Sequence, residues 1–518
     1  MQKKLLVVLV FAFLICEGQS SYEIIKGREF DVSDKRKYFW SVEPDENSFY
    51  AYRAFYTQSE PFLCRFDAKT ATLQYEKNLG IKDEETILET HNQNGRIYII
   101  TVITHKKEKR KLYLLRVIKS DTGEQIGDIK VMEDIDTKKD NGGHRHFNVE
   151  FSPDGKKMMT VLDEKNEGEP RTVRAKLFNS ASFSKIWEKH PVENLEKSPL
   201  YVSDFKVDND DRFIYQGGYL NRENPDDVIY CICISPGNNP VTHFVKIPSG
   251  NKTILNPNLE LFDNSLVYTG EFLDGINTSK YDGHLKTTGF FAITVDPKDA
   301  VIKGMSFEYL SPELQEKLTY KAKNLVYNTK GVTDDNKLFK HFKSIYIDGR
   351  LYVVKYHGYD YTIVNNGSSV SYHYGREIIV LKYNAETKLE KMKIIPRNTV
   401  GVERAISDKY TNHLMVTGTK KLHLIFYDRD KNLLQFPDVN NYEPSKYKGI
   451  VTFSQKTWPV YVTLNENGEL SREIIKSDYQ VELWNIETPN VKKSNSLLLA
   501  PQSENKNKTR MDLLTIKE

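Results

Sequence analysis

The residues of this sequence best suited to chemistry are histidines and tyrosines gathered in three polar stretches. The stretches are 141–147 (NGGHRHF), 274–289 (DGINTSKYDGHLKTTG) and 356–376 (YHGYDYTIVNNGSSVSYHYGR). Aromatic rings with polar tips stack on sugars and peptides and lose little entropy on binding. The candidate ligand-binding residues are therefore His144, His146, Tyr281, His284, His357, Tyr359, Tyr361, Tyr372, His373 and Tyr374. The alternative is that these stretches are long polar loops that pack only on each other.

Other site chemistries find less support in the residue spacing. His144 and His146 stand two apart, as ligands on a strand would, but zinc needs three or four convergent ligands. The run DNDDR at 208–212 lacks the glycine and the closing glutamate of a calcium loop, so it reads as a turn. No G-x-S-x-G elbow and no phosphate-binding or dinucleotide fingerprint occurs. We therefore expect no metal, no cofactor and no identifiable catalytic residue.

The elements that must position these residues follow a repeat. FNVEFSPDGKKMMTVLDE at 147–164 pairs two alternating runs through an Asp-Gly turn, and a second strand pair follows at 172–190. Comparable units of four short strands recur at a spacing of roughly 45 to 65 residues, the period of propeller blades. The sequence predicts an all-β fold: a seven- or eight-bladed β-propeller of four-stranded blades, with one short helical insertion.

The end of the chain leaves the blade number open. A seventh unit is expected over 405–436, and further strands follow over 449–475, 495–502 and 511–518. These strands form either an eighth blade or a blade shared with the N-terminal strand near SYEIIKGREF, which would close the ring. The helical insertion is expected near 311–330, with Ser311 as its cap and Pro312 in its first turn.

Several of these segments together resemble a known family. They are the SPDG unit, DFKVDNDDRFIYQGGYL, GFFAITVD after a long loop, the EIIVLKYNAETKLEKMKIIPR segment, and NENGELSREII followed by SNSLLLAP. This order resembles a group of uncharacterised secreted bacterial β-propeller-like proteins over nearly the whole mature chain. The resemblance implies a propeller fold and export in a Gram-negative bacterium, and it assigns no catalytic residue.

The N-terminal residues indicate export. Lys3 and Lys4 precede an apolar run from Leu5 to Cys16 that is short for a membrane span, which is the pattern of a signal peptide over 1–18. The alternative is a lipoprotein signal with Cys16 acylated. Residues 19–518 are then one mature propeller domain in the periplasm, at the cell surface or outside the cell. We expect no membrane span in it.

Composition narrows the partners. The 74 basic and 71 acidic residues give a net charge of +3, which offers no case for nucleic-acid binding. Cys64, Cys231 and Cys233 make no disulfide framework, and the last two share a strand face as small buried residues.

Two functions remain from the sequence. The first is a binding or scaffold protein that engages a protein or glycan at the cell envelope through loops on one face. The alternative is a glycan-acting hydrolase or lyase with its site at the channel mouth. A convergent cluster of histidines, tyrosines and carboxylates would favour the enzyme, and a shallow aromatic patch would favour the scaffold.

Overall fold

The computed structural model describes most of the chain. The described residues are 22–32, 34, 38–55, 60–137, 144–165, 172–190, 201–220, 228–237, 241–262, 265–275, 287–314, 339–365, 368–402, 415–417, 420–443, 446–447, 457–476, 496–499, 502–505 and 508–517. Tyr281, His284 and the signal peptide expected over 1–18 lie outside these residues.

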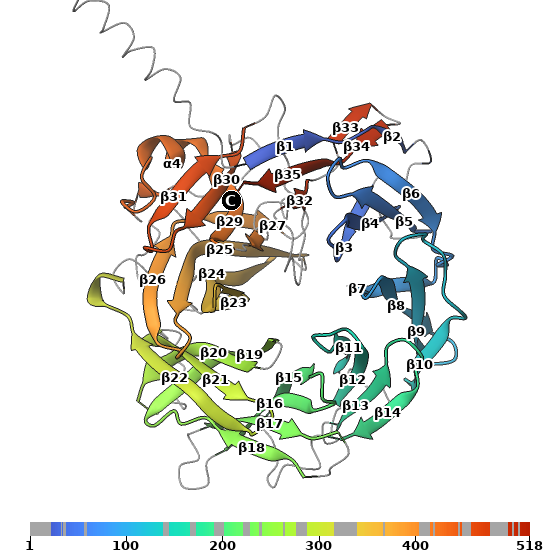
Figure 1. Ribbon diagram of the computed structural model, residues 1–518, viewed down its shortest axis with the longest axis horizontal. Coiled ribbons are helices and arrows are strands. Elements are labelled where there is room, and N and C mark those ends of the chain that lie inside the picture. The colour runs from blue at the N-terminus through green and yellow to red at the C-terminus, as the bar shows by residue number, and fades with distance from the viewer. Residues whose placement is uncertain are drawn as a thin grey trace, which may run out of the picture.

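Seven antiparallel sheets of four consecutive strands stand around one axis, so the chain is a seven-bladed β-propeller (Figure 1). Blade 1 comprises β3 (Tyr38–Val42), β4 (Ser48–Ala54), β5 (Phe62–Asp67) and β6 (Leu73–Asn78). Blade 2 comprises β7 (Glu85–Gln93), β8 (Arg96–His105), β9 (Arg110–Lys119) and β10 (Lys130–Asp136). Blades 3 and 4 comprise β11 (His144–Phe151), β12 (Lys157–Lys165), β13 (Thr172–Asn179), β14 (Lys185–Lys189), and β15 (Tyr201–Val207), β16 (Phe213–Leu220), β17 (Val228–Ser235), β18 (His243–Lys246).

Blades 5 to 7 follow, and blade 6 contains the two longest strands that the structure describes. Blade 5 comprises β19 (Lys252–Phe262), β20 (Ser265–Asp274), β21 (Gly289–Asp296) and β22 (Val301–Tyr309). Blade 6 comprises β23 (Phe339–Ile347), β24 (Arg350–Asn365), β25 (Ser368–Tyr383) and β26 (Leu389–Ile395), with β27 (Thr399–Val402) paired to β25. Blade 7 comprises β28 (Met415–Thr417), β29 (Leu422–Arg429), β30 (Thr457–Leu464) and β31 (Leu470–Ile474).

The two ends of the chain pair to close the ring between blades 7 and 1 (Figure 1). β1 (Tyr22–Lys26) and β32 (Ser496–Leu498) flank β35 (Asp512–Ile516), and β2 (Phe30–Asp31) and β33 (Gln502–Asn505) flank β34 (Lys508–Arg510). The Tyr22 hydroxyl donates to the Ile474 carbonyl at 3.0 Å and accepts from the Lys476 amide at 2.7 Å, which ties β1 to blade 7. The closing sheets are thus shared between both ends of the chain, as one of the two alternatives predicted.

Apolar side chains fill the spaces between blades. The described residues form seven buried clusters, and each cluster joins one pair of neighbouring blades. The cluster between blades 7 and 1 also contains Tyr22, Met511, Leu513, Leu514 and Ile516 of the closing strands. Strand side chains alternate between the two faces of a blade, so each blade supplies apolar residues to both of its neighbours.

Two expectations from the sequence were wrong in detail. Residues 421–436 do not form the last two strands of the seventh unit, because β29 is its second strand and α4 (Asp430–Gln435) follows directly. The segment DKNLLQ contains no β-branched residue and begins with an aspartate, and both features favour a helical turn. The stretch 356–376, which the sequence suggested was a polar loop, is largely the extension of β24 and β25 into a long hairpin.

The helical insertion begins where expected. Residues 312–314 are helical, and the Ser311 hydroxyl accepts a hydrogen bond from the Leu314 amide at 3.2 Å. Leu314 packs against the apolar cluster between blades 5 and 6. The expected remainder, to residue 330, lies outside the described residues. Within the described part of the chain, no helix is both long and apolar enough for a membrane span.

Candidate functional site

The structure places the candidate residues of the stretch 356–376 on one hairpin. His357 lies in β24 and is buried, with 1% of its surface exposed. The backbone register sets Tyr359 opposite Tyr374 and Tyr361 opposite Tyr372, while His373 pairs with Asp360. The hairpin therefore brings these six candidate residues onto adjoining strands, and their role in binding stays a prediction.

The histidine pair of the stretch 141–147 lies elsewhere. His144 and His146 are at the start of β11, opposite Lys165 and Asp163 of β12, and His146 is exposed. Blade 3 is separated from blades 5 and 6 by blade 4, so these histidines belong to another sector of the ring (Figure 1). Among the described residues, no group of three or more His, Cys, Asp or Glu side chains is arranged to hold a metal ion.

Carboxylates on the innermost strands, or directly after one of them, link successive blades. At five junctions a carboxylate of one blade accepts a hydrogen bond from the inner strand of the next blade. The pairs are Glu43 with the Asn92 amide (3.3 Å), Glu89 with the Val149 amide (3.3 Å), Glu150 with Lys206 Nζ (2.7 Å), Asp204 with the Leu259 amide (3.3 Å) and Glu260 with the Ser344 amide (3.4 Å). β-Bulges in β7, β15, β19 and β23 interrupt the strand pairing beside several of these contacts. The inner wall is therefore acidic and polar.

The junction between blades 5 and 6 carries further buried polar groups. On the blade 5 side, Asn258 and Thr269 are register partners, and Glu271 lies two residues beyond Thr269 on β20. Strand alternation puts Thr269 and Glu271 on the face that also carries Val267, which packs against blade 6. Glu271 is fully buried and accepts hydrogen bonds from the Phe339 amide at 3.0 Å and from the Thr287 hydroxyl at 2.5 Å.

The blade 6 side of the junction carries cationic and hydroxyl groups. Lys355 on β24 is fully buried and stands opposite His341 of β23 in the register. Leu351 and Val353 share its face and pack against blade 5, so Lys355 continues an apolar stripe as its polar end. His341 Nε2 lies 3.3 Å from Glu260 Oε1 across the junction. We define the blade 5–6 cluster as Asn258, Glu260, Thr269, Glu271, His341, Ser344 and Lys355.

Burial shifts the protonation of this cluster. Loss of solvent raises the pKa of Glu271 to about 7, and the nearby Lys355 and the Thr287 hydroxyl offset that rise only in part. Burial lowers the pKa of Lys355, and the charges of Glu271 and Glu260 offset part of that shift. For Glu260, burial is outweighed by the hydrogen bond and charge of His341, so its pKa is lowered. The junction therefore holds one carboxyl that titrates near neutral pH beside one that stays ionised.

His357 belongs to a second, charge-balanced group at the same end of β24. Its Nδ1 lies 3.2 Å from Glu377 Oε2, and Arg376 Nη2 donates to Glu377 Oε1 at 3.1 Å. Burial would raise the pKa of Glu377, but Arg376 and His357 outweigh it and hold this pKa at about 2. His357 is therefore held by a carboxylate partner, which is the usual arrangement for an oriented buried imidazole.

Several buried polar atoms of the cluster have no hydrogen-bond partner among the described residues. They are Asn258 Nδ2, Glu260 Oε2, Thr269 Oγ1, His341 Nδ1, Ser344 Oγ and Lys355 Nζ, while His341 Nε2 has only the 3.3 Å ion-pair contact with Glu260. Each such atom costs about 1–3 kcal/mol if it is left unpaired. Donors and acceptors are mixed in this set, so water or a hydroxyl-bearing ligand satisfies it better than an apolar group. Asn258, Glu260 and His341 are partly exposed, while Thr269 and Lys355 lie deeper.

Sequence reasoning missed Glu271 and Lys355, although a signal for both was present. YTGEFL and YVVKYHG each place one charged residue within an otherwise apolar or neutral strand. The period of two puts Lys355 on the face of Val353 and Glu271 on the face of Thr269, where neighbouring blades meet. A charged side chain on a buried strand face is rarely tolerated without a partner, so such a residue indicates a polar site between the blades.

The paired cysteines behave as the sequence predicted. Cys231 and Cys233 are buried on β17 with their sulfurs 3.6 Å apart. A Cβ at Gly217 would lie 3.2 and 3.4 Å from the two sulfurs, so only glycine fits easily opposite them. Cys64, Cys231 and Cys233 are free thiols.

Comparisons with known proteins give only distant structural likenesses. Neither models of protein families nor curated proteins give a match. Similar solved structures include the β-propeller domain of the trilobed protease from Pyrococcus furiosus, at 10% identity and a TM-score of 0.39, covering 85% of this chain and 98% of that one. The quinohemoprotein alcohol dehydrogenase ADHIIG from Pseudomonas putida HK5 is 9% identical with a TM-score of 0.40, over 95% and 76% of the chains. The polysaccharide lyase Uly1 is 10% identical with a TM-score of 0.36, over 95% and 100%.

Proposed function

We propose that the chain is a binding protein whose blade 5–6 cluster takes a hydroxyl-rich ligand, a glycan, at the inner wall of the propeller. The supporting observation is the set of six buried donor and acceptor atoms that have no hydrogen-bond partner among the described residues. A sugar hydroxyl both donates and accepts, so a row of hydroxyls matches a mixed set of this kind. The long hairpin β24–β25, which extends beyond Lys355, supplies tyrosines suited to stacking on sugar faces.

Binding to a panel of neutral and acidic oligosaccharides, measured by calorimetry, tests this proposal. Thr269→Val and Lys355→Met each remove one unpaired group while nearly keeping side-chain volume. Thr160→Val, at a buried threonine of blade 3, is the matched control. A glycan that binds the unaltered chain and Thr160→Val, and loses about tenfold in affinity with each cluster variant, supports the proposal. The proposal is refuted if both cluster variants bind the glycan with unchanged affinity. It is also refuted if no oligosaccharide of the panel binds and the cluster holds only ordered water.

A glycan-acting enzyme is the second candidate, favoured by Glu271. A carboxyl whose pKa is raised to about 7 is suited to accept or donate a proton at neutral pH. Lys355, with its pKa lowered by burial, interacts electrostatically with Glu271 and stands opposite His341 in the strand register, so these two residues are candidates for further proton transfer in a lyase or hydrolase. Product formation from a bound glycan that Glu271→Gln abolishes while binding persists would establish the enzyme. Binding without turnover leaves the first proposal.

We further propose that the chain is exported and meets its ligand or partner at the cell envelope. The signal pattern over 1–18 and the resemblance to secreted proteins support this. Fractionation of cells that make the full chain, followed by N-terminal sequencing of the product, tests it. A cytoplasmic product that begins at the initiator methionine contradicts export.

A further inference from the structure

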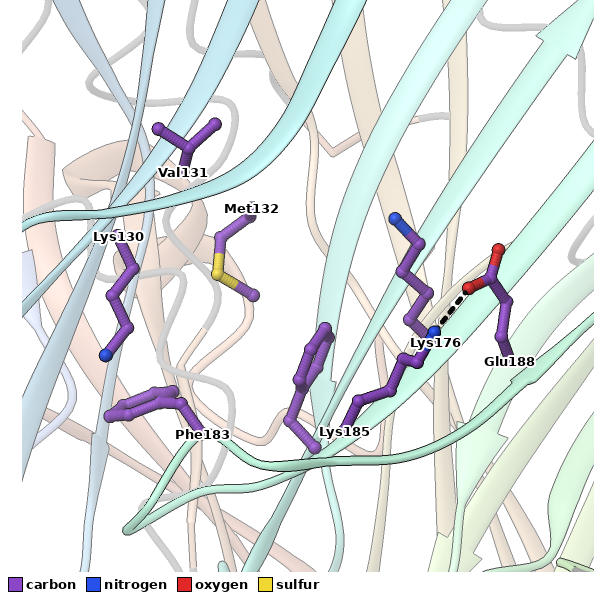
Figure 2. A pocket seen from close by; sticks show the side chains of 8 residues that line it. Lys130, Val131, Met132, Lys176, Phe183, Lys185 and Glu188 are labelled. Carbon is purple, nitrogen blue, oxygen red and sulfur yellow. Dashed lines mark hydrogen bonds and ion pairs between the residues drawn. The ribbon is translucent and has the colours of Figure 1, made fainter.

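A pocket of about 450 Å³ opens on the outer rim between blades 2 and 3 (Figure 2). Its residues come from β10 on one side and from β13, β14 and their connecting turn on the other. They are Lys130, Val131, Met132, Lys176, Phe178, Phe183, Lys185 and Glu188. A volume in this range is typical of ligand pockets in proteins. The pocket lies away from the blade 5–6 cluster and is independent of the function proposed above.

Local backbone features shape the pocket. The register of β10 shifts between Val131 and Glu133, and this bulge re-aims the Met132 side chain. Phe183, in the turn between β13 and β14, has φ of 61°. Residues other than glycine adopt this left-handed conformation only at a cost in free energy. The Phe183 ring lies under Lys130 Nζ, 5.0 Å from the ring centroid. Figure 2 shows Met132 and Phe183 facing each other across the opening.

The pocket has an apolar floor and a basic margin. Met132, Phe178 and Phe183 are partly buried against the apolar cluster between blades 2 and 3. Glu133 pairs with Arg174 and with Lys176, each at 2.7 Å, and Glu188 pairs with Lys185 at 3.0 Å. The Lys185 ammonium is the main cause that lowers the pKa of Glu188, so this acid stays ionised. Among the described residues of the pocket and its ion pairs, two acids thus stand beside four bases, Lys130, Arg174, Lys176 and Lys185, which gives an excess of two positive charges.

The edge of blade 2 lies directly beside the pocket. Among the described strands, β10 pairs only with β9, so its other side offers backbone donors and acceptors. Ile129 and Val131 on this edge are 43% and 60% exposed. Exposed apolar residues on an open strand edge are the features of a site for strand addition.

We propose that this rim pocket binds an extended acidic peptide segment of a partner protein. The segment adds to β10 as an outer strand and inserts an apolar side chain between Met132 and Phe183. Its flanking Asp or Glu side chains pair with Lys130 and Lys185. The excess positive charge selects an acidic partner, and the strand edge selects a peptide over a small molecule.

Selection from a random peptide display library on the mature chain, followed by fluorescence anisotropy with the enriched peptides, tests the proposal. We expect enriched peptides to carry Asp or Glu around an apolar residue and to bind more weakly at high salt. Lys130→Gln and Lys185→Gln should each weaken binding by about fivefold, since partly exposed ion pairs contribute modestly. Lys119→Gln, at an exposed lysine near the end of β9, is the control and should bind normally.

Hydrogen exchange gives an independent readout of the binding mode. The bound peptide should slow exchange of amides in β10 and leave β17, in blade 4, unchanged. Enriched peptides without acidic residues, equal binding by the lysine variants, or no added protection in β10 would each overturn the proposal. Failure to enrich any peptide overturns it as well. Binding of decanoate with the same lysine dependence, in place of any peptide, would assign the pocket to a small apolar anion and also overturn it.

Discussion

Glu271→Gln is the most direct test of the electrostatics of the blade 5–6 cluster. The folded chain raises the pKa of this carboxyl from 4.5 to about 7, so the folded state holds its proton more tightly than the unfolded chain does. The stability from this group is therefore complete below about pH 4.5 and is lost as the pH rises through about 7. Such a change in pKa corresponds to about 3 kcal/mol of unfolding free energy.

Urea unfolding across this pH range measures the effect. Glutamine keeps a side-chain oxygen that accepts the Phe339 amide hydrogen bond but has no proton to lose near neutral pH. The stability advantage of the unaltered chain over Glu271→Gln should therefore fall by about 3 kcal/mol from pH 4.5 to 8. In a Lys355→Met background the fall should be larger, because Lys355 lowers the pKa of Glu271.

Glu377→Gln is the matched control, at a second buried glutamate. Arg376 and His357 hold the pKa of Glu377 at about 2, so its removal should cost a constant free energy from about pH 5 to 8. A flat difference for Glu271→Gln over the same range would refute the burial argument. Infrared difference spectroscopy gives a second check, because a protonated carboxyl band should disappear in Glu271→Gln and persist in Glu377→Gln.

Three further predictions concern the frame and the processing of the chain. Arg116→Met should destabilise the fold by about 3–5 kcal/mol in urea unfolding, since it leaves Glu85 buried without its cation, while Arg110→Met at an exposed pair should change stability little. Tyr22→Phe should cost about 1–3 kcal/mol in the same assay, because the Lys476 amide loses its acceptor where the ring closes. N-terminal sequencing of the exported chain should begin at Gln19, and a lipid-modified Cys16 in its mass spectrum would contradict this.

The sequence predicted the propeller because its turns and strand periods are local signals. The SPDG turn illustrates this: Gly155 has φ of 67°, and Asp154 accepts from the Ser152 hydroxyl and the Lys156 amide, so a few residues determine the hairpin. The DNDDR turn is also local, with Asp208 accepting from the Asp210 and Arg212 amides. Such contacts join residues that are close in the sequence, so the local residue pattern predicts these turns.

Features that depend on distant residues were not predictable in the same way. The long hairpin of blade 6 reads as a loop because Gly358 and the Asn-Asn-Gly at 365–367 interrupt the alternation, yet its backbone pairs as far as Asn365 and Ser368. The blade number was ambiguous because α4 and residues 436–456 separate the second strand of blade 7 from its third. The partners in the blade 5–6 cluster are up to 97 residues apart, from Asn258 to Lys355, and no local pattern relates them.

The blade 5–6 cluster differs from two other buried polar networks of the ring because one oxygen of its Glu260 has no hydrogen-bond partner among the described residues. In blade 2, both oxygens of Glu85 pair with Arg116, and one also accepts from Thr101. In blade 7, Asp428 accepts from Arg472 at 3.0 Å, from Asn432 at 2.8 Å and from Tyr447. These two networks pair both oxygens of their carboxylates, and they fix β9 in blade 2 and the α4 segment in blade 7.

A structural role alone does not account for the blade 5–6 cluster. Lys355 is as deeply buried as Asp428, yet its ammonium has no hydrogen-bond partner among the described residues, and neither has Thr269 Oγ1. A buried network that only held blades together would gain stability from apolar replacements at these positions. Lys355→Met combined with Thr269→Val should therefore stabilise the chain in either case, and should abolish ligand binding only if the function proposed here is correct. Measured together, urea unfolding and calorimetry separate these outcomes, because only a binding site loses affinity as it gains stability.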